Sequence, residues 1–302
     1  MKFQRPAVDL HMHSVCSDGT DSPAELLARV KAAGIGLFAL TDHDAICGAQ
    51  ALLALLGPED PRFLPGVEFS CKDKLGKYHV LGYAYDPASP AIRAVVELGH
   101  GYRMTKLRAR LEALERKFGF RFPEEAERGL YALDNPGKPH IGNLMVRYGF
   151  AESKDQAIRQ FLNELHVRGD YVRPEEAIRG ILDAGGIPVL AHPCYGDGDQ
   201  LILGPELEER VERLMDFGLQ GLEAYYSGFP EKLRNQVLAL AERRGLYVTA
   251  GSDYHGKNKL VRLGDTGFPR QGPVPAGWER FLEAAFRRAG QELPAAAQAP
   301  QL

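Results

Sequence analysis

The alternation of short apolar runs with helical patterns is the feature that most constrains the fold of this chain. Such alternation is typical of consecutive β-strand and α-helix units, which build an α/β fold. Ser22 can cap the first helix, and Pro23 suits its first position. Glu25 completes a capping box, and Gly34 ends the pattern. The predicted strands span residues 8–11, 37–41, 63–69, 78–85, 187–191, 221–226 and 246–250, and further helices are predicted over 46–56, 174–184, 206–217, 231–244 and 277–288.

Residues 89–170 interrupt this rhythm and are predicted to be mostly helical. Apolar side chains recur there at helical spacing, at Leu107, Leu111, Leu114 and Phe118. Basic residues lie between them, at Lys106, Arg108, Arg110, Arg116 and Lys117. This basic stretch could contact nucleic acid, but a solvated helix face beside an apolar stripe is the favoured interpretation. We expect residues 1–88 and 171–290 to form one unit, with 89–170 as a capping insertion and 291–302 as a disordered tail.

The balance of charge limits the kind of partner. Lys and Arg number 37 against 40 Asp and Glu, which gives a net charge of -3. A protein that binds long nucleic acid usually carries a basic excess, so that function is disfavoured. No apolar stretch approaches the length of a membrane span, and residues 1–6 lack the apolar segment of a signal peptide. The four cysteines form no CxxC pair, so a reduced cytoplasmic protein is expected.

Six of the nine histidines lie at the ends of predicted strands, most with a carboxylate close by. His11 and His13 are two residues apart on a strand, so they can face the same way and share one ion. The clusters are Asp9-Leu10-His11-Met12-His13 followed by Asp18, Thr41-Asp42-His43-Asp44, Gly66-Val67-Glu68, Tyr78-His79-Val80, Val189-Leu190-Ala191-His192-Pro193 and Gly251-Ser252-Asp253-Tyr254-His255.

Any one of these histidines could be a core residue with satisfied hydrogen bonds. Six separate strand ends with ligand-type side chains are harder to explain by packing. In barrels of alternating strands and helices, the loops at the carboxyl ends of the strands converge over one mouth and carry the active site. The pattern therefore predicts a metal site at that mouth.

In combination these motifs, which run from residue 9 to 255, resemble the PHP (polymerase and histidinol phosphatase) family. The resemblance implies a distorted seven-stranded (β/α)7 barrel, and seven strands were counted above. It also implies two or three divalent ions, with Mn²⁺ or Fe²⁺ favoured and Zn²⁺ possible. Position by position, it implies nine ligands: His11, His13, Asp18, His43, Glu68, His79, His192, Asp253 and His255.

The resemblance further implies a metal-dependent phosphoric ester hydrolase that uses a metal-activated hydroxide. Three divalent ions, three carboxylates and one hydroxide leave a net charge of about +2, which suits a phosphate dianion. The residues assigned to catalysis are Asp42, Glu68 and His192, with Glu68 as the bridging carboxylate. Asp9, Asp42 and Asp44 are interpreted as orienting groups, acid–base helpers or merely structural residues.

Substrate contacts are predicted within the insertion and after the sixth strand. Gly137-Lys138-Pro139-His140 resembles a segment that some small PHP phosphoesterases place over the site, usually as Arg-x-His. Lysine offers a point charge instead of a bidentate fork, so detailed phosphate geometry does not transfer. The predicted substrate-binding residues are Lys138, His140, Tyr226, Ser227 and Arg103, with Arg147 as a weaker candidate.

Several activities remain open at this stage. The insertion resembles that of nucleoside 3',5'-bisphosphate phosphatases, of enzymes that open cyclic ribose phosphates, and of 5'-to-3' exonucleases on short RNA. A small phosphorylated metabolite or nucleotide is the expected substrate, and histidinol phosphate is an alternative that the large insertion fits less well. A metal-binding scaffold and a metal-dependent amide hydrolase are further alternatives. Oligomeric state cannot be predicted.

The cysteines fall close to the predicted ligands. Cys16, Cys47, Cys71 and Cys194 each lie within a few residues of one, and all four are predicted to occupy loops. None stands at a family ligand position. Thiols near a cationic cluster are expected to oxidise readily.

Overall fold

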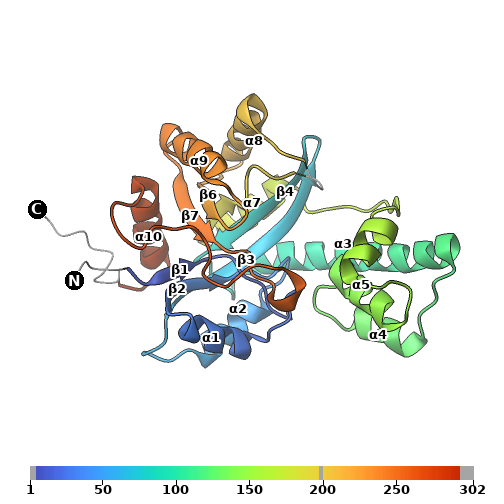
Figure 1. Cartoon of the computed structure of the whole chain (residues 1–302). Helices are drawn as coiled ribbons and strands as arrows, with labels where there is room; N and C mark the ends of the chain where they lie inside the picture. The colour runs from blue at the N-terminus through green and yellow to red at the C-terminus, as the bar shows by residue number, and fades with distance from the viewer. Residues whose placement is uncertain (1–4, 197–199, 293–302) are drawn as a thin grey trace, which may run out of the picture.

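The computed structural model describes residues 5–196 and 200–292, and its centre is a single seven-stranded sheet (Figure 1). The predicted disordered tail falls almost entirely on residues 293–302, which lie outside the described residues. All seven predicted strands are present: β1 (Ala7–Asp9), β2 (Ile35–Leu40), β3 (Arg62–Asp73), β4 (Gly76–Tyr83), β5 (Ile187–Leu190), β6 (Gly221–Tyr226) and β7 (Tyr247–Gly251).

The strands follow one another in chain order across the sheet, and four of the six pairings are parallel. The exceptions are β3–β4 and β4–β5, which are antiparallel. No helix separates β3 from β4, so the two strands form a hairpin that is longer than the predicted strands. Glu68 and His79 therefore lie inside strands, opposite Leu81 and Ser70 respectively, and not at strand ends as predicted. The antiparallel turn still brings His79 to the edge where the parallel strands end.

Six helices cover the sheet: α1 (Pro23–Ala32), α2 (Cys47–Leu55), α7 (Pro174–Asp183), α8 (Gly204–Asp216), α9 (Glu231–Arg243) and α10 (Ala276–Arg288). The predicted cap of α1 is confirmed, because the Ser22 side chain accepts from Glu25 N and the Glu25 carboxylate accepts from Ser22 N. Two apolar cores lie beneath these helices. The smaller one packs α1 and α2 against β2 through Leu26, Val30, Phe38 and Leu52.

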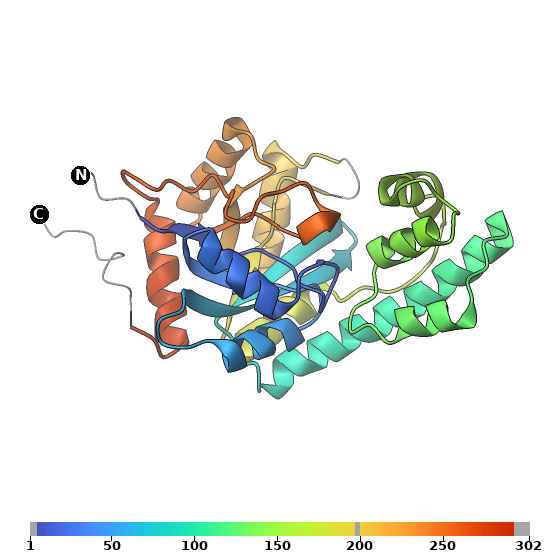
Figure 2. The same ribbon diagram turned by 60° about the horizontal axis from the view of Figure 1, so that its bottom comes forward.

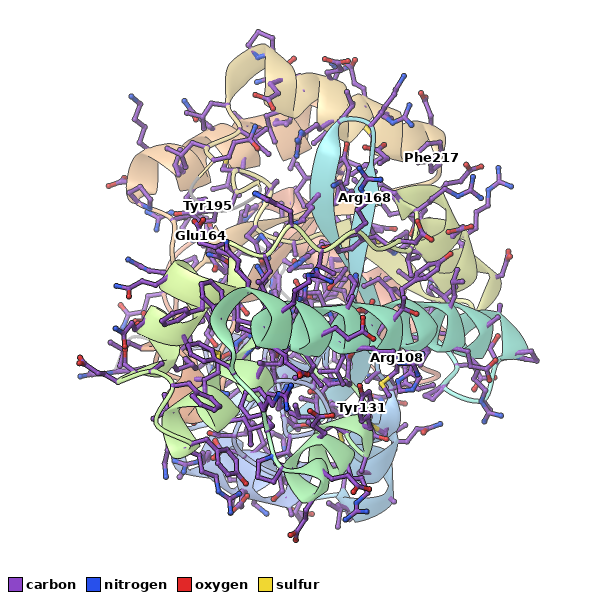
Figure 3. The ribbon with its side chains drawn as sticks, turned by 90° about the vertical axis from the view of Figure 1, so that its right-hand side faces the viewer. Arg108, Tyr131, Glu164, Arg168, Tyr195 and Phe217 are labelled. Atoms are coloured by element: carbon purple, nitrogen blue, oxygen red, sulfur yellow. The ribbon has the colours of Figure 1, made fainter. Side chains whose placement is uncertain are left out.

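The interrupting stretch is helical, as predicted, and it has an apolar core of its own. It comprises α3 (Pro90–Phe118), α4 (Glu124–Tyr131), α5 (Lys138–Arg147), α6 (Lys154–Gln156) and a π-helical turn, η1 (Ala157–Leu162). Leu107, Leu111 and Leu114 are buried in that core, which confirms the predicted apolar stripe. Figures 2 and 3 show α3 crossing one side of the molecule with α4 and α5 against it; Arg108 lies on α3 and Tyr131 ends α4. No helix among the described residues is both long and apolar enough to cross a membrane.

One predicted feature of α3 is wrong. Lys106 was assigned to a solvated face with the other basic residues, but its side chain is buried, whereas Arg108, Arg116 and Lys117 are exposed. Lys106 lies over the ring of Tyr171, with Nζ 3.3 Å from the ring centroid. The face of α3 that carries Lys106 is therefore turned toward the sheet and its loops.

Backbone hydrogen bonds also join the segments that follow β1 and β7. Leu10 N donates to Ala250 O, and Asp253 N donates to His11 O, each over 2.8 Å. On the other side of the same segment, Thr41 N donates to Met12 O over 2.9 Å. The loop after β1 is thus held between its two neighbours, which places its histidines at the centre of the mouth.

Candidate active site

The nine predicted ligands lie together at one end of the sheet. His11, His13 and Asp18 come from the loop after β1, and His43 from the loop after β2. Glu68 projects from β3 and His79 from β4. The loops after β5 and β7 supply the remaining three, which are His192, Asp253 and His255. Sequence reasoning thus identified residues that the tertiary structure does bring into one cluster.

Glu68 lies at the centre of this cluster and is almost fully buried. Its Oε1 is 2.9 Å from His79 Nδ1 and 3.4 Å from His192 Nε2. Its Oε2 is approached by three further imidazole nitrogens, at 3.1, 3.2 and 3.1 Å, from His11, His13 and His43. A carboxylate surrounded in this way can bridge more than one ion.

Asp18 and Asp253 extend the cluster on either side of His13. His255 Nε2 lies 3.2 Å from Asp18 Oδ1, and His43 Nε2 lies 3.9 Å from the same oxygen. Asp253 Oδ1 is 3.4 Å from His13 Nε2 and 3.6 Å from His11 Nε2. Three overlapping groups result, each with ligand atoms within 4.8 Å of one another: His13, Asp18, His43 and His255; His11, His13 and Asp253; and His43, Glu68 and His79.

The donor atoms of these groups fit divalent cations. Buried nitrogen and oxygen atoms without a hydrogen-bond partner are costly, typically about 1–3 kcal/mol each and more when charged. Such atoms gather here: His11 Nε2, His13 Nε2, Asp18 Oδ1, His43 Nδ1, His79 Nδ1 and both carboxylate oxygens of Glu68. Imidazole and carboxylate together suit Mn²⁺, Fe²⁺ or Zn²⁺. The protein itself leaves these atoms unsatisfied, and a cation cluster would satisfy them.

The charges of the site also favour the binding of cations. Burial alone would raise the pKa of Glu68, but the imidazoles of His11 and His79 hold it well below its usual range. Burial lowers the pKa of His43 well below its usual value, so this ring stays neutral as a metal ligand must. Burial would lower the pKa of His11 as well, yet Glu68 and Glu223 raise it well above its usual value. The carboxylates thus draw positive charge into the site.

Backbone strain is concentrated at the same place. Among the described residues other than glycine, positive φ angles occur at Asp44, Ala84, His192 and Asp253. His192, with a φ of 28°, and Asp253, with a φ of 60°, are both predicted ligands. Such backbone costs on the order of 1–3 kcal/mol per residue and persists where the surroundings hold a side chain in position.

A layer of acidic residues behind the ligands holds them in place. Asp42 accepts from Ser14 N, Ser14 Oγ and Ser17 Oγ, each over 2.7 Å, and so fixes the loop that carries Asp18. Asp9 accepts from Ser252 N and Ser252 Oγ and ties β1 to the segment before Asp253. Burial raises the pKa of Asp9 to about 6.

Glu223, which the sequence analysis missed, belongs to this layer. Its Oε1 lies 2.9 Å from His11 Nδ1, and its Oε2 accepts from His192 N over 2.9 Å. The available signal was a lone glutamate inside the otherwise apolar strand β6, where burial is complete. Lys259 was missed as well. It forms an ion pair with Asp253 Oδ2, and Tyr226 Oη donates a hydrogen bond to the same oxygen over 2.9 Å.

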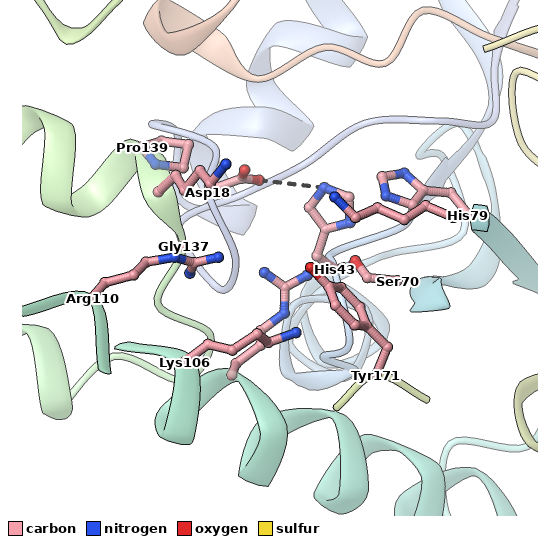
Figure 4. Close-up of a pocket in the computed structure, with 12 residues that line it drawn as sticks. Asp18, His43, Ser70, His79, Lys106, Arg110, Gly137, Pro139 and Tyr171 are labelled. Atoms are coloured by element: carbon pink, nitrogen blue, oxygen red, sulfur yellow. Dashed lines mark hydrogen bonds and ion pairs between the residues drawn. The ribbon is translucent and has the colours of Figure 1, made fainter. Parts of the chain in front are cut away.

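A cavity of about 200 Å³ opens beside the cluster and is lined by basic side chains (Figure 4). Asp18, His43 and His79 form its inner wall, and Tyr171 and Ser70 contribute to its side. Five cations line it, from β4, α3 and α5: Lys77, Arg103, Lys106, Arg110 and Lys138. Arg103 and Lys138 were predicted as substrate contacts, whereas the other three were not. The signal for Lys106 and Arg110 was their spacing from Arg103, which places all three on one face of α3.

A second cavity, of about 290 Å³, lies on the other side of His43 and His79. Its remaining lining includes Tyr195, Tyr226 and Lys259, together with His192, Asp253 and His255. The two cavities therefore meet over the cluster, one basic and the other largely aromatic.

The other predicted substrate contacts have partners within the protein. Ser227 Oγ donates to Ser252 O over 2.7 Å, and His140 Nδ1 accepts from Gly137 N over 3.0 Å at the start of α5. Neither residue lines either of these two cavities. Lys138 Nζ donates to Asn163 Oδ1 over 2.6 Å while it lines the basic cavity.

Comparison with known proteins agrees with this arrangement. A 3',5'-nucleoside bisphosphate phosphatase of Chromobacterium violaceum is 31% identical over 82% of this chain and 87% of its own. A 5'-3' exoribonuclease of Haemophilus influenzae is 26% identical over 90% of this chain and 98% of its own. A phosphoribosyl 1,2-cyclic phosphate 1,2-diphosphodiesterase of Eggerthella lenta is 29% identical over 82% of this chain and 94% of its own.

The fold and the family model complete the comparison. A solved structure from Bifidobacterium adolescentis, assigned to the metal-dependent phosphoesterases, superimposes with a TM-score of 0.79 at 25% identity. It covers 96% of this chain and 98% of its own. The PHP domain model matches residues 9–172, more than half of the sequence. The chain therefore belongs to the PHP family and is a metal-dependent phosphoesterase.

Proposed function

We propose that this enzyme removes a phosphate from a small nucleotide that carries a second phosphate on the same sugar, such as a nucleoside 3',5'-bisphosphate. The observation that carries the proposal is the basic cavity beside the cluster. A phosphate monoester needs the cluster for its reacting group, but it has no second phosphate to offer to the five cations that line this cavity.

The charge in the basic cavity matches a second phosphate. A bound phosphate brings about 1.5 to 2 negative charges, and charge-assisted hydrogen bonds to it are worth roughly 1.5–3 kcal/mol each. Arg103 is partly engaged, since its Nε donates to Asp44 Oδ2 and its Nη2 to Ser70 Oγ. Lys106 and Arg110 extend from α3 toward Asp18 and His43 (Figure 4). The amino terminus of α5 at Lys138 adds backbone N–H groups, which favour anions.

The aromatic cavity suits the remainder of a nucleotide. Tyr195 and Tyr226 lie with their ring centroids 5.9 Å apart, and Tyr226 is 5.3 Å from the ring of His192. Aromatic rings of this kind can stack on a base or pack against a sugar. A nucleotide that spans both cavities would place the phosphate between them over His43 and His79.

The nine ligands are proposed to hold two or three divalent ions, Mn²⁺ or Fe²⁺ by preference and Zn²⁺ as a possibility. Bound there, such ions would polarise the phosphoester and lower the pKa of a bound water. Glu68 would hold the centre, while Asp42 acts by fixing the loop of Asp18 and does not face either cavity. His192 lines the aromatic cavity with Nε2 3.4 Å from Glu68 Oε1, so that it would hold an ion at the wall of this cavity.

We also propose that the strands form a distorted barrel and that residues 89–170 cap its mouth. The hydrogen bonds between the segments after β1 and β7 support a distorted barrel that is closed at its mouth. Residues 89–170 would form the cap, because α3 and α5 supply four of the five cations of the basic cavity. Lys154 of the insertion also donates to Asn258, which follows the ligand His255.

Rates on matched substrates test the proposal. The full-length enzyme, supplied with Mn²⁺, would be assayed on a nucleoside 3',5'-bisphosphate, the two corresponding monophosphates, a cyclic ribose phosphate and a short 5'-phosphorylated oligoribonucleotide. We expect the highest kcat/KM on the bisphosphate, with loss of turnover on chelation. Equal kcat/KM on monophosphates and bisphosphate would contradict the assignment of the basic cavity.

A 5'-to-3' exonuclease acting on short RNA is the second candidate. The Haemophilus influenzae exoribonuclease matches 90% of this chain, and the 5'-terminal nucleotide of a phosphorylated RNA carries a 5'-phosphate and a 3'-phosphodiester at the two positions that a 3',5'-bisphosphate occupies with monoesters. Preferential turnover of the oligonucleotide, with release of mononucleotides from its 5' end, would favour this activity.

A further inference from the structure

We infer that Cys16, Cys47 and Asp134 form a second metal site, separate from the nine-ligand cluster and suited to a thiophilic divalent ion such as Zn²⁺. The two sulfur atoms and a carboxylate oxygen of Asp134 all lie within 4.8 Å of one another. None of the three residues belongs to the cluster described above. The inference is independent of the proposed function.

The distances suit a tetrahedral ion. Zinc–sulfur bonds of about 2.3 Å and zinc–oxygen bonds of about 2.1 Å separate the two ligands of a tetrahedral site by about 3.6 Å. Cys47 Sγ and Asp134 Oδ2 are 3.6 Å apart. The thiols of Cys16 and Cys47 are close enough to be hydrogen-bond partners. Three protein ligands would leave a fourth position for water, as in many exposed zinc sites.

Each ligand is held by its own surroundings. Cys16 N donates to Ser14 Oγ over 3.1 Å, and that hydroxyl donates to the buried Asp42. Cys47 begins α2, and the next residue, Gly48, is packed so tightly that a Cβ there would come within 2.2 Å of Asp42 Oδ2. The same buried carboxylate thus fixes both cysteines relative to each other. Preorganised ligands of this kind favour metal binding over rearrangement.

Asp134 is positioned from the other side, by the insertion. Its backbone oxygen lies 2.6 Å from His100 Nδ1 of α3. The neighbouring Asn135 is almost fully buried, and neither of its side-chain polar atoms has a hydrogen-bond partner. The loop between α4 and α5 is therefore placed by α3 while its polar groups remain only partly satisfied by the protein.

The electrostatic surroundings favour a cation. The Asp134 carboxylate lies 3.6 Å from the Cys47 sulfur, and the buried Asp42 carboxylate is joined to Cys16 N through the Ser14 hydroxyl, so two negative charges lie close to the pair of thiols. Cys16, Cys47 and Asp134 are all at least partly exposed, so an ion can reach them.

A metal at this site would join three segments that serve the active site. Cys16 lies two residues before Asp18, Cys47 follows His43 by four, and Asp134 precedes Lys138 by four. The ion would clamp the insertion onto the loops after β1 and β2, and so hold the wall of the basic cavity.

Co²⁺ spectroscopy distinguishes this site from the cluster. Cobalt bound to thiolate gives an intense near-ultraviolet charge-transfer absorption, which histidine and carboxylate ligands do not produce. Metal-free, fully reduced enzyme titrated with Co²⁺ should develop this absorption, and its final amplitude should correspond to one cobalt ion per chain, in addition to the ions that the cluster takes up. Cys16→Ser and Cys47→Ser should abolish it, and Asp134→Asn should weaken the binding by more than about tenfold, or about 1.4 kcal/mol.

Cys71→Ser is the matched control, because Cys71 is buried in β3, where its thiol donates to Phe69 O over 3.5 Å and a hydroxyl can replace it. This variant should keep the absorption unchanged. All variants should retain Mn²⁺-dependent turnover, which shows that they fold. A second readout is amide hydrogen exchange of residues 132–137, which Zn²⁺ should slow in the parent enzyme and not in Cys47→Ser.

Three results would overturn the inference. The first is no thiolate absorption in the reduced parent enzyme, and the second is an undiminished absorption in Cys47→Ser. The third is a Cys16–Cys47 disulfide that forms in air despite excess Zn²⁺, since a bound ion should protect both thiols. That last result would instead identify the pair as a redox site.

Discussion

Glu223 and His11 face each other across the floor of the cluster, with Glu223 Oε1 2.9 Å from His11 Nδ1. The same carboxylate accepts from the backbone N–H of His192 through its other oxygen. A proton on His11 Nδ1 leaves Nε2 free to bind a metal ion, and it fixes the orientation of the ring. One buried glutamate thus positions two of the nine proposed ligands.

Glu223→Gln tests this arrangement. The amide keeps the size of the side chain but removes the charge that holds the His11 proton, so metal affinity should fall about 10- to 100-fold. Turnover should be low at limiting Mn²⁺ and recover as Mn²⁺ is raised, which a titration of activity and of bound Mn²⁺ would measure. Glu212→Gln, on the exposed surface of α8, is the control. An unchanged Mn²⁺ dependence would exclude the positioning role.

Glu68→Gln and Asp253→Asn remove ligand charge at the centre of the cluster. Each substitution keeps the side-chain volume, so the fold should survive while turnover falls by much more than tenfold, a change of about 1.4 kcal/mol in the barrier. Metal content and circular dichroism should be measured beside the rate. Asp60→Asn, which alters an ion pair with Lys31 and a hydrogen bond from Gly57 N, should leave the rate unchanged. A variant with more than about a tenth of the parent rate and full metal content would refute the assignment.

The basic cavity should discriminate between substrates. Lys138→Ala and Arg110→Met each remove one cation from its lining, so kcat/KM should fall roughly 10- to 100-fold for a bisphosphate and little for a simple aryl phosphate. Arg108→Ala changes an exposed arginine on the same helix and should affect neither substrate. His140→Ala was expected from the sequence to act like Lys138→Ala; because His140 does not line the cavity, a smaller effect is now predicted. Equal losses on both substrates would argue against a site for a second phosphate.

Lys106 should make binding of the second phosphate depend on pH. Burial, together with the neighbouring charges of Arg103 and Arg110, lowers the pKa of Lys106 to about 7, so its charge is present below pH 7 and is lost above it. KM for a bisphosphate should therefore rise between about pH 6 and 8 more than KM for an aryl phosphate. Lys106→Met should remove this difference between the two substrates. Lys106→Arg should also remove it between pH 6 and 8, because an arginine keeps its charge throughout this range. The groups that face Lys106 are Arg103, Arg110, Asp44, Lys77 and Tyr171.

If KM changed with pH in the same way for the bisphosphate and the aryl phosphate in the parent enzyme, this result would contradict the role of Lys106. The comparison between substrates is needed because phosphate groups themselves titrate near pH 6.

The nine side chains of the cluster could be named from the sequence because each stands in a short motif beside or within an apolar strand. His11 and His13, for example, follow β1 directly, and the parallel arrangement of strands brings such positions to one edge. The strand count and the helical insertion were predictable for the same reason, since hydrophobic periodicity is a local signal. The four cysteines were predicted to lie in loops, and this was wrong for Cys71, which is inside β3, and for Cys47, which begins α2.

The sequence by itself determined the α/β fold class and the family, and its short motifs named the nine side chains that the structure gathers into one cluster. Only the tertiary structure decided which distant side chains meet: Glu223 with His11, the cations of α3 with His43, and Cys16 with Asp134. These contacts join residues far apart in the chain, and they depend on the antiparallel β3–β4 hairpin and on how the insertion packs over the mouth. Local sequence patterns predict burial and periodicity, but they do not predict which buried or half-buried charged side chains will face one another.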